Sequence, residues 1–115
     1  MRHVVRLHTV VIGYSELEHA EPELGRAWGV FRPGLGYELV QPVFALFREA
    51  VPMKGGEAMD EIKLARYHAA REKLGLELLD DTGRVIETSA IHIADYAPAR
   101  ELEVLIRDQL YWQGR

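Results

Sequence analysis

Apolar residues are densest between Gly25 and Phe47, a stretch that holds all three Phe residues of the chain and one of its two Trp residues. From Arg26 to Arg32 the side chains alternate, so that Trp28 lies on one face of the segment and Phe31 on the other. Successive side chains of a strand point to opposite faces, and this spacing therefore predicts a strand that is apolar on both faces.

A helix is predicted to follow the turn residues 33–36, Pro-Gly-Leu-Gly. Pro42 lacks a backbone N–H and is tolerated only in a first turn, so the helix should begin between Glu38 and Gln41 and run to about Ala50. Its apolar side chains leave only a narrow polar strip, and such a helix must be covered on nearly every side. One sheet of a small domain covers a single side, so the pattern predicts a partner surface, most simply a second copy of the chain.

Three further segments carry only short or interrupted periodicity. Residues 2–12 are apolar in a strand-like pattern, either as one long strand or as two short strands broken near Thr9, and Gly13-Tyr14 is expected to end them. Residues 15–18 have the S-x-x-E form of a capping box, which predicts one helical turn. Residues 51–56, with a Pro and paired Gly residues, are predicted to be a linker.

The second half of the chain predicts two helices around a hairpin. Residues 57–74 begin with acidic and end with basic side chains, which complements the helix dipole, and Gly75 is suited to the position after the last turn. Residues 76–93 read as two strands joined by a turn at 80–83. A last helix is predicted to begin near Pro98, because an apolar face with helical spacing follows it, made of Leu102, Leu105, Ile106 and Leu110.

Composition bounds the class of protein. The chain has 115 residues, of which 48% are hydrophobic and 28% charged, and we expect residues 1–115 to form a single domain. The elements predict an α+β fold, with a small, mostly antiparallel sheet of about four strands and about three helices packed on one face. The net charge of −4 argues against a nucleic-acid or anionic-membrane partner. Without cysteine or a long apolar stretch, a cytoplasmic location is expected.

Several short motifs are explained better by turns and loops than by chemistry. Asp81-Thr82-Gly83 resembles the catalytic triplet of retroviral-type aspartic proteases, but Arg84 stands where that family has a small residue, so we predict a hairpin turn. Gly34-Leu35-Gly36 lacks the further residues of a phosphate-binding loop. The acidic run Glu16–Glu23 contains donors that a divalent metal accepts, but a solvated loop is the simpler interpretation, and no metal or cofactor is predicted.

Two functions follow from these patterns. The first is a non-enzymatic protein-interaction module that self-associates as a homodimer, or binds another protein, through Leu39, Val43, Phe47, Tyr111 and Trp112. The alternative is a small enzyme or small-ligand binder with an aromatic-lined pocket formed by Trp28, Phe31, Tyr37 and Phe44. In that case His92, or the Glu16–Glu23 loop, would supply the polar chemistry.

Overall fold

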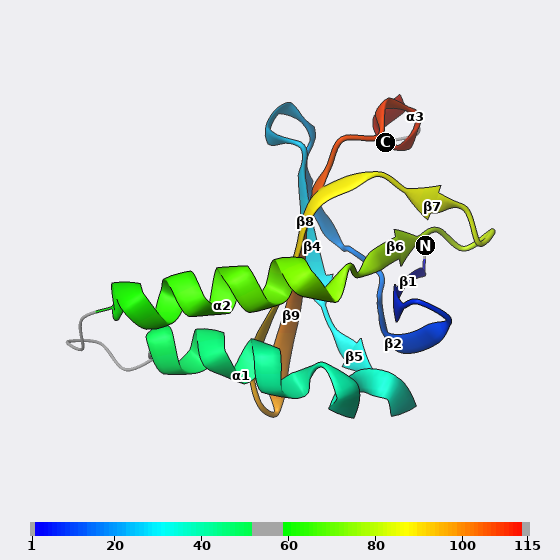
Figure 1. Ribbon diagram of the computed structural model, residues 1–115. Coiled ribbons are helices and arrows are strands. Elements are labelled where there is room, and N and C mark those ends of the chain that lie inside the picture. Colours follow the sequence, from blue (N-terminus) through cyan, green and yellow to red (C-terminus); the bar gives the residue numbers. More distant parts are fainter. Residues whose placement is uncertain (1, 52–58, 114–115) are drawn as a thin grey trace.

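A computed structural model describes residues 2–51 and 59–113, which fold as an α+β protein with two antiparallel sheets (Figure 1). The first sheet, in the order β5-β2-β1-β6-β7, consists of β1 (His3–Leu7), β2 (Val10–Ser15), β5 (Arg32–Pro33), β6 (Glu77–Leu79) and β7 (Val85–Ile86). The second, in the order β3-β4-β9-β8, consists of β3 (His19–Glu21), β4 (Arg26–Val30), β8 (Thr88–Tyr96) and β9 (Ala99–Ile106). The α-helices are α1 (Gln41–Ala50), α2 (Glu61–Leu74) and α3 (Gln109–Gln113), and the 3-10 helices are η1 (Pro22–Leu24) and η2 (Leu35–Leu39). The predicted fold class is confirmed.

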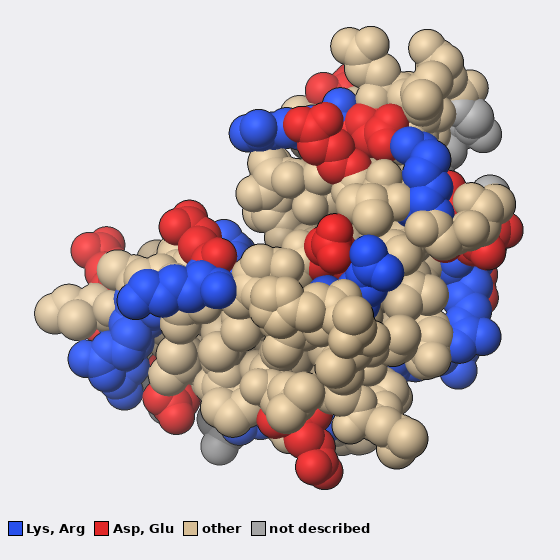
Figure 2. Space-filling model, turned by 45° about the vertical axis from the view of Figure 1, so that its right-hand side comes forward, with Lys and Arg blue, Asp and Glu red and all other residues tan. Residues whose placement is uncertain are grey.

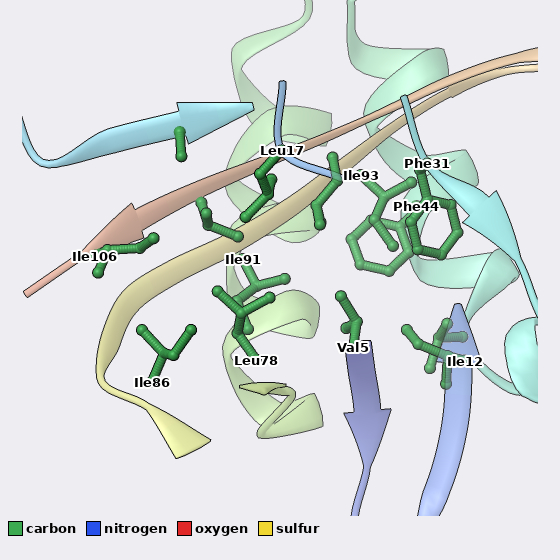
Figure 3. Packing of buried hydrophobic residues seen from close by; sticks show 14 of the residues in the cluster. Val5, Ile12, Leu17, Phe31, Phe44, Leu78, Ile86, Ile91, Ile93 and Ile106 are labelled. Carbon is green, nitrogen blue, oxygen red and sulfur yellow. The ribbon is translucent and has the colours of Figure 1, made fainter. Parts of the chain in front are cut away.

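The core lies between the two sheets. Val5 and Leu78 of the first sheet and Ile93 of β8 are fully buried, and Figure 3 shows side chains from both sheets and from α1 meeting in one cluster. Burial along β8 alternates from residue to residue, as expected for a strand with only one face in the core. The side chains on the opposite face of the four-stranded sheet, called here the outer face, therefore lie outside this core and are available to form a site.

The last helix predicted from Leu102, Leu105, Ile106 and Leu110 is wrong. Most of that segment is β9, which lies between β4 and β8 and pairs with both. Leu102, Val104 and Ile106 are buried at a period of two, whereas Leu105 points to the outer face. Pairing on both edges and this burial outweigh the helical spacing. Within residues 98–113 the α-helix is the short α3.

The N-terminal segment forms two strands, as one of the two interpretations predicted. β1 and β2 pair as a hairpin whose turn contains His8, at a positive φ of 55°. Gly13 does not end the second strand, which continues to Ser15. A Cβ atom at Gly13 would lie 2.2 Å from Cζ of Phe31, so glycine is needed because the ring packs directly on the strand.

The predicted capping box at residues 15–18 is wrong. Ser15 Oγ accepts a hydrogen bond from the backbone N–H of Leu17 (3.1 Å), in a bend between strands and not at a helix start. The Glu18 carboxylate accepts from the backbone N–H of Val30 (2.9 Å) and so ties this bend to β4. Ser15 and Glu18 thus both accept hydrogen bonds from backbone N–H groups, as residues of a capping box do. No helix follows them, however, because the chain continues into β3.

The two longer helices form an arm. α1 begins at Gln41 with Pro42 in its first turn, as predicted. α2 begins at Glu61, later than the predicted residue 57, because the Asp60 carboxylate caps it by accepting from the N–H of Lys63 (3.0 Å). It ends at Gly75 in the left-handed conformation (φ 65°), as predicted. The linker predicted at residues 51–56 lies, apart from Val51, outside the described residues. α1 and α2 lie side by side beside β8 and project away from the sheets (Figure 1).

The arm makes the molecule angular. Figure 2 shows the angle between the arm and the rest of the molecule as an open notch in the surface. Within residues 2–51 and 59–113, none of the helices combines the length and the apolar character that crossing a bilayer requires.

Candidate functional site

A groove of about 450 Å³ lies where the helical arm meets the outer face of the four-stranded sheet. Small-molecule sites typically measure roughly 300–1,000 Å³. We call it the outer groove, and it is lined by Phe47, Tyr67, His68, Arg71, Ala90, His92, Ala94, Glu101, Glu103 and Leu105.

Strand pairing explains which side chains reach the outer groove. Ala90, His92 and Ala94 alternate with core residues along β8, so all three point to the outer face. Their partners on β9, in the same order, are Leu105, Glu103 and Glu101. Tyr67 and Arg71 are four residues apart on α2 and therefore lie on one side of that helix.

His92 and Tyr67 form the polar centre of the groove. The Tyr67 hydroxyl and His92 Nδ1 are hydrogen-bonded, and the Phe47 ring stands edge-on to the imidazole with ring centroids 4.4 Å apart. Burial lowers the pKa of His92 to about 4, and burial also raises the pKa of Tyr67 well above its ordinary value of 10.0. Near pH 7 both groups are therefore neutral. When Tyr67 donates to Nδ1, the ring proton of His92 resides on Nε2; in the other tautomer His92 donates from Nδ1 to the Tyr67 oxygen.

This pair is poorly suited to acid–base catalysis near neutral pH. A general acid or base works best when its pKa lies close to the working pH. The pKa of His92 lies well below that range and the pKa of Tyr67 well above it. The pair can instead present a fixed, uncharged polar group to a bound molecule.

Glu103, beside His92, is neutralised by Arg26 of β4. Its Oε2 atom lies 2.6 Å from the NH2 nitrogen of Arg26 and accepts from Nε at 2.8 Å. Arg26 also pairs with Glu21 (2.8 Å), and its guanidinium stacks over the Trp28 ring, 4.0 Å from the centroid. The hydrogen bond to Glu103 raises the pKa of Arg26. The carboxylate of Glu103 is thus held within the sheet, but its charge still acts on the groove, where it opposes the fall in the pKa of His92 and adds to the rise in the pKa of Tyr67.

Arg71 differs from Arg26, because no acidic group among the described residues forms an ion pair with it. Its guanidinium lies 5.5 Å from the centroid of the Tyr67 ring. Arg71 also borders a second, smaller hollow of about 260 Å³, whose lining includes Thr88 and Ser89. A β-bulge lies between Thr88 and Ala90. The side chain therefore stands where the two hollows adjoin.

The low pKa of His92 predicts a loss of stability in mild acid. The unfolded chain takes up a proton near the ordinary pKa of 6.5, whereas the folded chain takes it up only near 4, so acid favours unfolding through this range. We expect His92 to remove about 2 kcal/mol from the free energy of unfolding between pH 7 and pH 5. Urea denaturation at both pH values should show this loss in the wild type and a loss smaller by that amount in His92→Gln. Equal losses in the two proteins would contradict the assignment.

Of the residues predicted to line an aromatic pocket, only His92 lines the outer groove. Phe31 and Tyr37 are buried, with ring centroids 5.3 Å apart, and Phe44 is fully buried. Trp28 lies on the outer face of β4, where His19 stacks on it at 5.4 Å. Val30, also on this face, is 55% exposed, so the apolar outer face of the predicted strand is only partly covered.

The residues predicted to form an interface are also dispersed. Leu39 is 62% exposed, Val43 is half-buried and Phe47 lines the outer groove. Tyr111 is buried against the ring of His3, and Trp112 donates from Nε1 to the carbonyl of Ile106 at 3.0 Å. Leu39 is thus the member of this set that offers apolar surface most openly.

The acidic run at residues 16–23 is distributed along a bend, β3 and part of η1. As described above, Glu18 binds a backbone N–H, Glu21 pairs with Arg26, and His19 stacks on Trp28. Among the residues that the structure describes, no three or more His, Cys, Asp or Glu side chains lie together as a metal-binding group.

A second polar cluster, away from the groove, lies inside the core. Asp95 is only 2% exposed; it accepts from the Tyr37 hydroxyl (2.7 Å) and the N–H of Ala97 (3.2 Å), and it pairs with Arg100 Nε at 3.0 Å. Burial alone would raise the pKa of Asp95, but the hydrogen bond from Tyr37 and the charge of Arg100 outweigh it and hold that pKa below 3.8. The cluster joins η2 to the β8–β9 hairpin.

The fold and the groove define a small α+β protein with a ligand-sized groove between a helical arm and a sheet face. Comparisons with known protein families, with curated proteins and with solved structures find no match to this chain.

Proposed function

We propose that the protein is a non-enzymatic small-ligand-binding module and that the outer groove is its binding site. The observation that supports this proposal is the neutral Tyr67–His92 pair set among apolar side chains in a groove of about 450 Å³. Ligand sites are typically apolar with a few fixed polar groups that orient the ligand. The absence of an acid or base with a pKa near neutrality in this pair favours binding over catalysis.

The apolar side chains of the groove provide a hydrophobic driving force for ligand binding. Phe47 forms one wall, and Ala90 and Ala94 leave space above β8 because their side chains are small. Leu105 is 38% exposed at the same place. A molecule with an apolar body would remove this surface from water, which favours binding by about 25 cal/mol for each Å² buried.

The test is a thermal-shift screen with small apolar compounds, because a ligand that binds only the folded state raises the unfolding midpoint. Hits are then repeated on Ala90→Trp, which fills the groove, and on Ala69→Trp, a matched change at an exposed position of α2 outside its lining. We expect the shift to persist in Ala69→Trp and to disappear in Ala90→Trp, with circular dichroism confirming that both variants fold. A screen without hits, or equal shifts in both variants, would contradict the proposal.

A second proposal is self-association as a homodimer through η2. Leu35 is 104% exposed and Leu39 is 62% exposed, four residues apart on the same 3-10 helix. The solvent-accessible area is 7083 Å², whereas a monomer of 13.1 kDa typically exposes about 6,400 Å². The excess of about 700 Å² is close to the area of about 800 Å² that each partner contributes to a standard interface.

Light scattering at low and high micromolar concentration tests the dimer. We expect the mass to rise with concentration for the wild type and for Leu110→Asp, a matched change of an exposed leucine on α3. Leu39→Asp should remain a monomer, because a carboxylate would lose its hydration at the interface. A wild-type protein that stays monomeric at high micromolar concentration would exclude this candidate.

A further inference from the structure

We infer that the ligand of the outer groove is a small organic monoanion, a carboxylate with an apolar body, whose charged group is bound by Arg71. This inference rests on the proposed function and specifies the chemical class of ligand for the same site.

Charge in the groove supports an anionic ligand. Arg71 is half-buried, and a guanidinium remains protonated at any physiological pH. Among the described residues it has the Tyr67 ring as a neighbour but no carboxylate in an ion pair. A carboxylate matches the planar guanidinium with two parallel hydrogen bonds, which makes arginine a better partner for it than lysine.

His92 supplies a second donor next to Arg71. Its Nδ1 atom is hydrogen-bonded to the Tyr67 hydroxyl, and no hydrogen bond joins its Nε2 atom to a described residue. In the tautomer that accepts from Tyr67, Nε2 carries the ring proton and is available as a donor. Both His92 and Arg71 belong to the lining of the groove. A neutral N–H donor and a guanidinium together suit an acceptor with two oxygens.

The acidic residues of the groove limit the charge that a ligand can carry. Glu103 is already paired with Arg26 at 2.6 Å. Glu101 is exposed and lies opposite Ala94, whereas Leu105 lies opposite Ala90, four pairs further along the strands. These carboxylates would repel a di- or triphosphate, because the described lining of the groove offers a single arginine, Arg71, against that negative charge. One negative charge at Arg71 is compatible with this arrangement.

The apolar side chains define the remainder of the ligand. Phe47, Ala94 and Leu105 line the same groove as Arg71 and can cover an aliphatic or aromatic body. The full volume of about 450 Å³ suits a molecule of one or two rings. The class is therefore an amphipathic carboxylate and not a free inorganic anion.

The experiment compares 1-naphthylacetate with 1-naphthylacetamide, which has nearly the same shape but no charge, by isothermal titration calorimetry at pH 7. For the wild type we expect the acid to bind at least about ten times more tightly than the amide, since hydrogen bonds to charged groups are roughly twice as strong as neutral ones. Arg71→Met keeps much of the apolar stem and should bind both probes with the weaker affinity of the amide. Arg66→Met, an exposed arginine on the same helix outside the groove lining, should retain the tenfold preference.

The outcomes separate this inference from the proposed function. Equal binding of acid and amide by the wild type would overturn the inference and leave the groove as a site for neutral ligands. Binding of neither probe would count against both. Loss of the preference in Arg66→Met as well as in Arg71→Met would show a general charge effect and would also overturn it. The wild-type comparison does not depend on the folding of any variant.

Discussion

Replacing Phe44 by alanine should lower the free energy of unfolding by about 3–5 kcal/mol. The Phe44 ring is fully buried, and Figure 3 shows it in the core cluster beside Phe31. It also lies near the Tyr67 ring, with centroids 6.1 Å apart, where α1 meets α2. Removing it takes away apolar contacts and leaves a cavity that the surrounding helices and sheets fill only in part. Urea denaturation followed by circular dichroism measures the change.

The matched control is Glu49→Ala on the same helix. Glu49 is exposed, so its removal should change stability by no more than about 0.5 kcal/mol. A loss below 1 kcal/mol for Phe44→Ala would contradict this prediction. It would mean that the packing of α1 against the core does not depend on the Phe44 ring.

The second large effect is expected at Asp95. Asp95→Ala would leave the Tyr37 hydroxyl and the Arg100 guanidinium without their acceptor inside the protein. Removing one member of a buried pair typically costs about 3–5 kcal/mol, and we expect that loss at pH 7. Asp81→Ala, in the exposed turn between β6 and β7, is the matched control and should change stability little.

Acid should reduce the penalty at Asp95. The folded pKa is lower than the ordinary value of 3.8, so the unfolded chain binds the proton first as the pH falls, and the carboxylate stabilises the fold only above that range. The stability difference between wild type and Asp95→Ala should therefore be constant from pH 7 to pH 5 and should shrink below pH 3.8. A difference that grows in acid would contradict this arrangement of charges.

The sequence predicted the elements whose limits depend on local chemistry. Pro42 placed the start of α1, and Gly75 placed the end of α2, because each restricts the backbone wherever it occurs. The hairpin of β6 and β7 was predicted from its polar turn. β9 was missed because Leu102, Leu105 and Ile106 also fit a helix, and only the alternation of Leu102 and Val104 with Glu101 and Glu103 indicated a strand.

The groove depended on contacts between distant residues, and the sequence predicted less of it. His92 was named as a candidate, but Tyr67 and Arg71 were not, because nothing in α2 indicates which side faces the sheet. Neutralisation of Glu103 by Arg26 spans 77 positions of the chain and depends on β4 pairing with β9. The rings of Phe31 and Phe44 were expected in a pocket because aromatic residues suit both pockets and cores, and in this structure they are buried in the core.

The central place of β9 in its sheet has a consequence for biosynthesis. β4 and β8 do not pair with each other in the order β3-β4-β9-β8, so β8 has no partner, and β4 has only β3, until the ribosome has released residues 99–106. A nascent chain that stalls before that point would carry two unpaired strand edges with apolar faces, a form prone to aggregation. Folding of this sheet is therefore expected to await translation of residues 99–106, and chains that terminate before them should be degraded.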